Sequence, residues 1–456
     1  MSEANEKEDK AMRKEAKARM AGKKMKADEK GGINLRVKTM DVTHSSASSV
    51  SPKRIKVLVV FGTRPEVIKL APVIEALRQS AARNSCGTSG ATANLIAFEP
   101  VICFTGQHRE MVEPFLEIFD LKPDYDLHVM QENQPLAGLT ARLLVRLDKV
   151  LGAEAPDWVI VQGDTTTAMA ASLAAFYRRI KVGHVEAGLR TEDKYNPFPE
   201  EINRRLISHL ADLHFAPTPR ARENLLREGL DRRAISVTGN TVVDALHMIL
   251  KKTEEPGWSE KLKGKIKEIK AEDWNAGKSA APSLSCPAKL ILVTAHRRES
   301  FGEGMERICE AINRLVSRVP EAEVIFPVHL NPNVRSVVLR RLSGLERVHL
   351  VEPLDYLTFV FLMRQADLIL TDSGGIQEEA PSLGVPVIVM RDKTERPEAV
   401  EAGVAWLGGT DPEKIERLAL TLLKKVESGE FRRSLKRRNP FGDGHAATRI
   451  IKRLGT

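Results

Sequence analysis

The chain has 456 residues, of which 42% are hydrophobic and 29% charged, and its formal net charge at pH 7 is +9. This length is enough for two or three domains with cores of their own, and the composition is typical of a soluble globular protein. The sequence contains no run of about eighteen uncharged apolar residues, so we expect no membrane-spanning helix and no membrane partner.

The positive charge is concentrated at the N-terminus. Residues 1–54 contain 14 Lys and Arg against 8 Asp and Glu, which accounts for most of the net charge. The segment KEDKAMRKEAKARMAGKKMKADEKGG has almost no large apolar residues and cannot bury a core face, so we predict a disordered basic tail over 1–54. The remaining chain is nearly balanced in charge and does not indicate a nucleic-acid partner. A role of the tail itself in binding nucleic acid or an acidic partner stays open.

The cysteines indicate a reducing compartment. Cys86, Cys103, Cys286 and Cys309 are far apart in the sequence and form no CxxC pair. This spacing favours reduced thiols over a disulfide framework or a zinc site. No signal-peptide pattern opens the chain, and early acidic residues argue against a transit peptide. We therefore expect a cytoplasmic protein.

After residue 54, short apolar strands alternate with helical patterns in two series. The first series contains KVLVVFG, PVICFTG, DWVIVQG, KVGHVE and DLHFAPT, and the second contains KLILVTA, EVIFPVH, RVHLVE, DLILTD and VPVIVM. Near-continuous apolar strands that alternate with helices are typical of parallel sheets covered on both faces. We predict an α/β fold with two Rossmann-like, doubly wound domains over 55–251 and 289–440 and a cleft between them.

Three further segments interrupt or follow these series. Residues 252–288 are rich in Lys, Glu, Ala and Ser, which predicts a peripheral helix and an exposed loop near the domain boundary. The stretch NSCGTSGATAN, residues 84–94, predicts a second surface insertion. For residues 441–456 we expect a helix that packs back on the N-terminal domain.

Polar side chains follow most of the predicted strands. Ligands of open parallel sheets bind beyond the carboxyl ends of the strands, where these side chains would gather. One such residue often only caps a helix, but so many together predict a site in the cleft. The residues are Arg64, Gln107, His108, Asp164, Glu186, His296, Arg297, Arg298, His329 and Asp372 to Gly375.

Several common motifs are absent from the sequence. No GxGxxG follows a strand, so the nicotinamide dinucleotide fingerprint is missing. No HExxH or other compact metal-ligand spacing occurs, and there is no GxSxG elbow. AGKS at 276–279 lacks the first glycine of a phosphate loop. We expect neither a metal nor a cofactor.

The stretch TDSGGIQEEAPSLGVP, residues 371–386, predicts a nucleotide site. Ser373, Gly374 and Gly375 lie where a strand ends and a helix begins, so their N–H groups can bind a phosphate. Glu378 and Glu379 follow in the helix, and Glu379 would repel phosphate but can accept hydrogen bonds from ribose hydroxyls. The alternative is a capped helix with an acidic first turn, and the pattern alone leaves both readings open.

The sequence resembles the non-hydrolysing UDP-N-acetylglucosamine 2-epimerase family over about residues 55–453. The segments that carry the resemblance occur in this order: FGTRPEVIKLAPVI, TGQHREM, GDTTTAMAASLAAFYRR, VGHVEAGLRT, NPFPEEINRRLISHLAD, TGNTVVDAL, TAHRRESFG, PVHLNPNV and TDSGGIQEEAPSLGVPVIVMRDKTERPEAV. The resemblance implies two Rossmann-like domains in the GT-B arrangement and a cytoplasmic homodimer. It also implies interconversion of UDP-GlcNAc and UDP-ManNAc through loss of UDP to a 2-acetamidoglucal, without nicotinamide or metal.

The resemblance further implies the catalytic groups. Asp164, Glu186 and Glu200 match the carboxylates near the sugar, and His296 matches the acid at the departing phosphate. Which carboxylate removes the C2 proton and which returns it stays open. Structural alternatives also stay open: Asp164 as the cap of the next helix, and Glu200 as an ordinary first-turn residue.

Substrate and activator positions follow from the same resemblance. The implied substrate-binding residues are Arg64, Lys69, Leu354 (through its backbone), Phe359, Ser373, Gly374, Gly375, Glu379 and Arg396. Gln107, His108 and Arg297 resemble a second site for UDP-GlcNAc as an activator, although Gln107 and His108 can equally be ordinary cleft residues. The tail, the insertion at 84–94 and the loop at 270–288 depart from the compact family pattern.

Other functions remain as alternatives. A GT-B glycosyltransferase would share the fold and the UDP-sugar but would need an acceptor pocket. A hydrolysing 2-epimerase would release N-acetylmannosamine and UDP, and a sister enzyme would epimerise a modified UDP-sugar. The family match in VEAGLRT and PEEINRR disfavours the glycosyltransferase. A non-catalytic nucleotide-binding protein is disfavoured because the acid/base positions are intact.

Overall fold

The computed structural model describes residues 53–85, 96–131, 134–271 and 289–456. The predicted basic tail therefore lies outside the described residues, apart from Lys53 and Arg54, which begin the first strand. Most of the insertion over 84–94 and the loop after residue 271 lie outside them as well.

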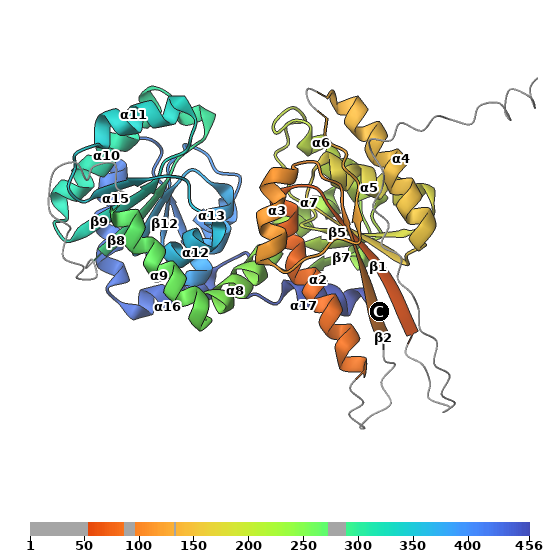
Figure 1. The fold of residues 1–456 in the computed structure, drawn as a ribbon. Helices are drawn as coiled ribbons and strands as arrows, with labels where there is room; N and C mark the ends of the chain where they lie inside the picture. The colour runs from red at the N-terminus through yellow and green to blue at the C-terminus, as the bar shows by residue number, and fades with distance from the viewer. Residues whose placement is uncertain (1–52, 86–95, 132–133, 272–288) are drawn as a thin grey trace, which may run out of the picture. The chain divides into compact units, whose positions relative to one another are not determined.

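The first lobe is built on a seven-stranded parallel sheet in the order β3-β2-β1-β4-β5-β6-β7 (Figure 1). Its middle strands are buried along almost their whole length, as expected for a sheet covered on both faces. The strands are β1 (Lys53–Phe61), β2 (Ile96–Phe104), β3 (Tyr125–Asp126), β4 (Trp158–Gln162), β5 (Lys181–Val185), β6 (Leu213–Ala216) and β7 (Ile235–Val237).

Most helices of the first lobe pack in two groups. One group joins α2 to α3, α8 and the C-terminal helix α17, and the other joins α4, α5 and α6. The helices are α2 (Arg64–Ser85), α3 (Arg109–Ile118), α4 (Leu136–Glu154), α5 (Thr166–Tyr177), α6 (Glu200–Leu210), α7 (Pro219–Arg227) and α8 (Thr241–Glu254), with a 3-10 turn η1 (Arg232–Ala234).

The second lobe repeats this plan with a six-stranded parallel sheet in the order β10-β9-β8-β11-β12-β13. Its strands are β8 (Lys289–Thr294), β9 (Ala322–Pro327), β10 (Val348–Val351), β11 (Leu368–Thr371), β12 (Val387–Val389) and β13 (Ala405–Leu407). The remaining elements are α9 (Pro256–Ala271), η3 (Arg298–Ser300), α10 (Glu303–Arg318), α11 (Pro332–Leu342), α12 (Tyr356–Gln365), α13 (Gly374–Leu383), α14 (Pro397–Glu401), α15 (Pro412–Val426), α16 (Gly429–Arg438) and α17 (Ala446–Leu454). The predicted α/β class with two doubly wound sheets is confirmed.

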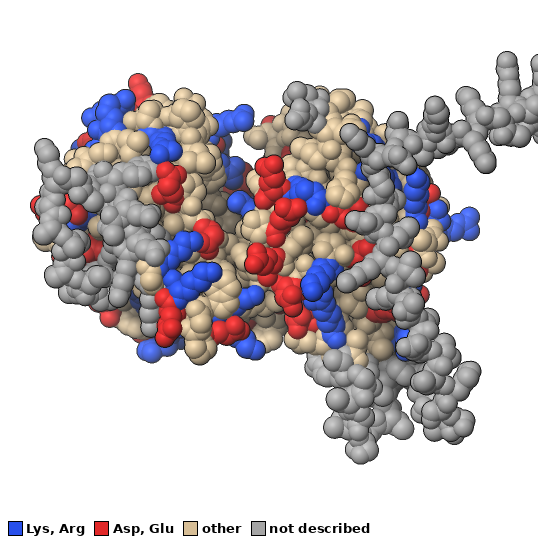
Figure 2. All heavy atoms as spheres, in the orientation of Figure 1, with Lys and Arg blue, Asp and Glu red and all other residues tan. Residues whose placement is uncertain are grey.

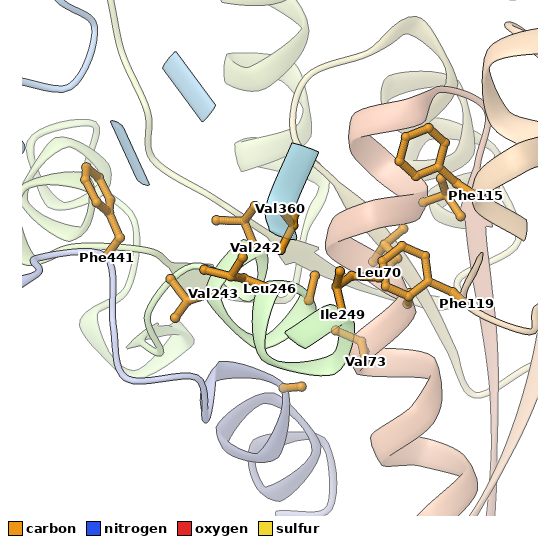
Figure 3. Packing of buried hydrophobic residues seen from close by; sticks show 14 of the residues in the cluster. Leu70, Val73, Phe115, Phe119, Val242, Val243, Leu246, Ile249, Val360 and Phe441 are labelled. Carbon is orange, nitrogen blue, oxygen red and sulfur yellow. The ribbon is translucent and has the colours of Figure 1, made fainter. Parts of the chain in front are cut away.

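Helix α8 carries apolar side chains that pack toward both lobes (Figure 3). Val242 lies beside Val360 of α12, while Ile249 lies beside Leu70 and Val73 of α2. All five are buried. Complete burial of such a side chain stabilises the fold by about 1.5–3 kcal/mol, so this layer fixes the position of α2, which carries candidate site residues.

The C-terminal helix α17 packs against α2 and α8. The carboxylate of Asp244 in α8 accepts hydrogen bonds from the N–H groups of Ala446 and Ala447, at 3.2 and 2.9 Å. Just before α17, the carbonyl of Phe441 accepts a hydrogen bond from the N–H of Asn240, at 2.7 Å. A carboxylate from α8 thus satisfies the free N–H groups that begin α17.

Candidate active site

Four charged side chains from the two lobes meet and form what we name the charge cluster: Lys69, Glu186, Glu378 and Arg396. Lys69 is ion-paired with Glu186, and its Nζ lies 3.7 Å from Oε2 of Glu378. Arg396 is ion-paired with Glu378, and its guanidinium lies 4.0 Å from Oε1 of Glu186. The side chains of Glu186 and Glu378 are only 6% and 1% exposed, so both carboxylates depend on these cations.

Glu186 follows β5, and its backbone has a φ of 62°, which is uncommon for a residue other than glycine. Gln162, at the end of β4, donates a hydrogen bond of 2.9 Å to Oε2 of Glu186. Burial raises the pKa of Glu186 above the usual range, against the opposing effect of Lys69. A carboxylate with a raised pKa is a better proton acceptor than an exposed glutamate.

Asp164 and Glu200 are positioned by helix α6 and the end of β4. Arg204 of α6 forms an ion pair with the Asp164 side chain, and Asn203 donates a hydrogen bond of 2.9 Å to the Asp164 carbonyl. Glu200 is the first residue of the same helix and is half-buried. Because β4 and β5 are parallel neighbours, Asp164 and Glu186 follow adjacent strand ends.

The alternative that Asp164 merely caps the next helix is wrong. Thr165 caps α5, with its side chain accepting a hydrogen bond of 3.0 Å from the N–H of Ala168. Asp164 instead pairs with Arg204. Its carboxylate therefore faces a cation of α6 and takes no part in starting α5.

His296 follows β8 and is held by the buried Asp372 at the end of β11. Its Nδ1 lies 3.1 Å from Oδ1 of Asp372, while the other carboxylate oxygen accepts the N–H groups of His296 and Arg297, at 2.6 and 2.7 Å. Burial raises the pKa of Asp372, but the contacts with His296 outweigh it and lower the pKa overall. His329 stacks on the His296 ring with centroids 5.7 Å apart. An ionised Asp372 thus orients an imidazole able to carry a proton.

Helix α13 begins where the sequence predicts it. Ser373 is the N-cap residue, but its hydroxyl makes no capping hydrogen bond to the helix. A side chain added at Gly374 would meet open space, and Gly375 is exposed. The first N–H groups of α13 therefore lie at an open helix start, which suits an anion.

Glu379 lies one residue beyond Glu378 but has different partners. The hydroxyl of Tyr356 donates a hydrogen bond of 2.5 Å to Oε1 of Glu379. Burial raises the pKa of Glu379 to about 7, partly opposed by the Tyr356 hydrogen bond and by the nearby Arg64. Successive helix positions are about 100° apart, so the two carboxylates point to different surroundings.

The remaining expected substrate residues occupy the start of α12 and the start of α2. Leu354 and Phe359 are half-buried and pack against the main hydrophobic cluster. Arg64 is the exposed first residue of α2. Lys69 and Arg396 belong to the charge cluster.

The expected activator residues come from both lobes. Gln107 accepts a hydrogen bond of 2.7 Å from the hydroxyl of Thr167, and burial lowers the pKa of the half-buried His108. Arg297 lies 3.9 Å from Glu395, and its buried Nε has no hydrogen-bond partner among the described residues.

Two buried carboxylates were not predicted as site residues. The sequence reading offered an acidic first turn for Glu378, which is wrong because α13 begins at Gly374 and its first turn contains no acidic residue. Nothing in the sequence marks Lys69 and Arg396 as the partners of Glu378. Glu66 is fully buried and accepts the N–H groups of Gly62 and Thr63, at 2.9 and 2.8 Å. The Thr63-x-x-Glu66 spacing of a capping box was the available signal for it.

Among the described residues, no group of three or more His, Cys, Asp or Glu side chains is arranged to hold a metal ion. In those same ranges, no helix is both long and apolar enough to cross a bilayer. On the face shown in Figure 2, Lys and Arg are interspersed with Asp and Glu. That face offers no broad field of one sign that would indicate nucleic-acid binding.

Comparison with known proteins identifies the family. The sequence model described as UDP-N-acetylglucosamine 2-epimerase matches residues 92–455. The chain belongs to the UDP-N-acetylglucosamine 2-epimerase family. It is 49% identical over 401 residues to the UDP-N-acetylglucosamine 2-epimerase of Yersinia pestis, covering 88% of this chain and 98% of the relative. It is 48% identical over 400 residues to that of Escherichia coli K12, with the same two coverages.

Solved structures agree with this family and with its GT-B-like fold. A putative UDP-N-acetylglucosamine 2-epimerase from Listeria monocytogenes is 44% identical with a TM-score of 0.74, covering 88% of this chain and 96% of its own. The Neisseria meningitidis enzyme, described as bound to UDP-GlcNAc, is 44% identical with a TM-score of 0.71, covering 88% and 99%. The resemblance inferred from the sequence motifs is confirmed.

Proposed function

We propose that the protein is a non-hydrolysing UDP-N-acetylglucosamine 2-epimerase that interconverts UDP-GlcNAc and UDP-ManNAc. The observation that carries this proposal is the buried contact of Glu186 with Lys69 and Arg396, which unites an acid/base group with two cations. The names of the relatives support it, and the Neisseria meningitidis structure is described as bound to UDP-GlcNAc.

The chemistry explains why such a site is needed. The proton on C2 of the sugar is not acidic, because that carbon carries no carbonyl. When the C1–O bond breaks, its electron pair leaves with UDP, and the C2–H electron pair forms a C1=C2 double bond while a base takes the proton. A proton then returns to the opposite face of C2 as UDP adds back to C1. The reaction involves no net oxidation and needs one acid/base group on each face of C2.

The catalytic roles follow from position and charge. Asp164, Glu186 and Glu200 supply the acid/base groups around C2, and His296 neutralises charge on the departing phosphate. The buried carboxylate of Asp372, whose pKa is lowered by its contacts with His296, holds the imidazole with Nδ1 3.1 Å from its Oδ1. A well-stabilised leaving group lowers the barrier to breaking the C1–O bond.

The second lobe holds most of the nucleotide. The open start of α13 binds the diphosphate through backbone N–H groups, and Glu379 accepts hydrogen bonds from the ribose. The uracil packs near Phe359 and the backbone of Leu354. The cations that complete the substrate site are Arg64, Lys69 and Arg396.

A second UDP-GlcNAc as activator would use Gln107, His108 and Arg297. Supporting this, Arg297 has a buried donor nitrogen that finds no partner in the part of the chain that the structure describes. An anionic ligand beside it would supply the missing acceptor.

We infer a homodimer formed through α4, α5 and α6. These neighbouring helices expose Leu136 and Val145 of α4, Phe176 and Tyr177 of α5, and Ile202 of α6. Phe176 and Tyr177 are 57% and 68% exposed. Large apolar side chains left exposed on neighbouring helices often mark an interface.

A cytoplasmic location agrees with the described thiols. Cys103 and Cys309 are free and buried, and burial raises the pKa of the Cys309 thiol to about 12. Inert reduced thiols are typical of proteins in reducing compartments.

The proposed activity is tested with dialysed protein in two separate reactions, one started from UDP-GlcNAc and one from UDP-ManNAc with a trace of UDP-GlcNAc to fill the proposed activator site. We expect both reactions to reach the same ratio of the two UDP-sugars, separated by anion-exchange chromatography, since an epimerase only sets an equilibrium. Accumulation of N-acetylmannosamine with UDP would instead identify a hydrolysing enzyme. Unchanged starting materials would contradict the proposal for this sugar.

A further inference from the structure

We propose that Glu378 is a positioning residue that holds Lys69 and Arg396 in the places from which both cations reach Glu186. The inference rests on the proposed epimerase function and adds a residue to it. Glu378 comes from the stretch that the sequence singled out for nucleotide binding, yet its partners give it a separate role.

Glu378 is enclosed by groups from both lobes. Oε1 is ion-paired with Arg396, while Oε2 lies 3.7 Å from Lys69 Nζ and accepts a hydrogen bond of 3.2 Å from Nδ2 of Asn240. Its side chain is 1% exposed. Asn240 is the N-cap residue of α8, so one carboxylate joins α13 to α2, to α8 and to the segment before α14.

The neighbouring Glu379 provides a contrast within the same helix turn. Glu379 meets a neutral hydroxyl, and burial raises its pKa to about 7. Burial also opposes ionisation of Glu378, but Arg396 and Lys69 outweigh it and lower the pKa of Glu378. Glu378 therefore stays ionised, as a residue that fixes cations must.

The charge balance around Glu186 depends on this carboxylate. The groups that face Glu186 are Lys69 and Arg396, which favour its ionised form, Glu378, which disfavours it, and the neutral Gln162. Without the charge of Glu378, two cations would face Glu186 alone. Its pKa would then fall, and its readiness to accept a proton would fall with it. Arg396 would also lose the partner that fixes its guanidinium.

The test compares Glu378→Gln with the wild-type protein in the epimerisation assay across pH 5.5–9. We expect kcat to fall about 10–100-fold, and KM to rise as well, because Lys69 and Arg396, which Glu378 positions, also belong to the proposed substrate site. We also expect the limb of the pH profile of kcat that reports the ionisation of Glu186 to move to lower pH by about one unit. The reason is that the substitution removes a like charge beside Glu186.

The matched control is Glu398→Gln. Glu398 also joins the lobes, accepting a hydrogen bond of 3.0 Å from the hydroxyl of Thr218, but it lies outside the charge cluster. This variant should keep the wild-type kcat and pH profile. An equal loss of kcat in Glu398→Gln would mean that any contact between the lobes has this effect, and it would overturn the proposal.

Glu378→Asp keeps the charge on a shorter side chain. It should recover part of kcat and leave the pH limbs in their wild-type positions, and it replaces Glu378→Gln if that variant does not fold. Wild-type kcat and limbs in Glu378→Gln, or a wild-type kcat in Glu378→Asp when it alone folds, would overturn the inference. An inactive wild-type protein would instead overturn the proposed function, and the inference with it.

Discussion

Identical side chains behave differently in this protein according to what surrounds them. Burial raises the pKa values of Glu66 and Glu379 to about 7, while the two cations beside Glu378 lower its pKa. In each case burial disfavours the ionised form, and only Glu378 has enough positive charge nearby to reverse the effect. For Glu378 and Glu379 the sequence alone does not reveal this difference, because their partners come from distant segments.

Glu66 should make stability depend on pH. Its folded pKa lies above that of an unfolded glutamate, so the folded protein keeps a proton that the unfolded chain loses. Stability attributable to this group is therefore full below about pH 4.5 and is lost as pH rises through 7. The free energy of unfolding of Glu66→Gln minus that of wild type should therefore increase by on the order of 2 kcal/mol from pH 5 to pH 8, as measured by urea denaturation.

Glu75→Gln, in the same helix but half-buried, is the control for loss of a carboxylate from α2. A stability difference between wild type and Glu66→Gln that is the same at pH 5 and pH 8 would show that Glu66 does not hold a proton in this range.

Glu379 should make nucleoside binding depend on pH in the opposite direction. The proposed ribose contact needs the ionised carboxylate, and burial raises the pKa of Glu379 to about 7. Uridine affinity should therefore rise about five- to tenfold between pH 6 and pH 8, measured by calorimetry. Uridine is chosen because it has no phosphate that titrates in this range.

In Glu379→Gln the uridine affinity should be weaker and nearly independent of pH. If wild-type affinity did not change over this range, or fell as pH rises, Glu379 would not be the group that binds the ribose.

At the scale of elements, the helices differ in how completely their apolar side chains are buried. Val242, Leu246 and Ile249 of α8 are buried between the lobes, while α5 ends in the exposed Phe176 and Tyr177. Helices α4 and α6 both pack against α5 and expose apolar residues of their own. The surface of α4, α5 and α6 is therefore the candidate contact between two copies of the chain.

Phe176→Glu should dissociate the proposed homodimer. A charge placed in an apolar, desolvated contact is costly, so we expect the mass from light scattering at micromolar concentration to fall from about 101 to the 50.6 kDa of one chain. Val237→Glu, at an exposed position on β7, is the control and should leave the mass unchanged. A wild-type protein that is already monomeric would contradict the inferred dimer.

At the scale of the whole molecule, the sequence was sufficient to predict the architecture of two parallel sheets covered by helices. Runs such as DWVIVQG and DLILTD predicted strands because parallel strands buried on both faces are apolar along their length, and β4 and β11 confirm them. Very short strands such as β3, with two residues, carry no such pattern and were not predicted. The tail and the predicted loops lie largely outside the described residues and stay predictions.

The site was only partly predictable, for a physical reason. The ends of parallel strands meet at one edge, which is why Asp164, Glu186 and His296 were found from the sequence. Contacts between the lobes join residues that are far apart in the sequence, so they leave no periodic pattern from which they could be predicted. The pairing of Lys69 with Glu378, and the fact that Thr165 rather than Asp164 caps α5, became visible only in the structure.

The central claim is that the C2 proton of the sugar is exchanged at a site built around Glu186. The most direct measurement is proton NMR of UDP-GlcNAc with purified protein in D2O, without added nucleotide cofactor or metal. The account predicts UDP-ManNAc with deuterium at C2, formed about 10²–10⁴-fold more slowly by Glu186→Gln. UDP-ManNAc that retains its original C2 hydrogen would contradict the account.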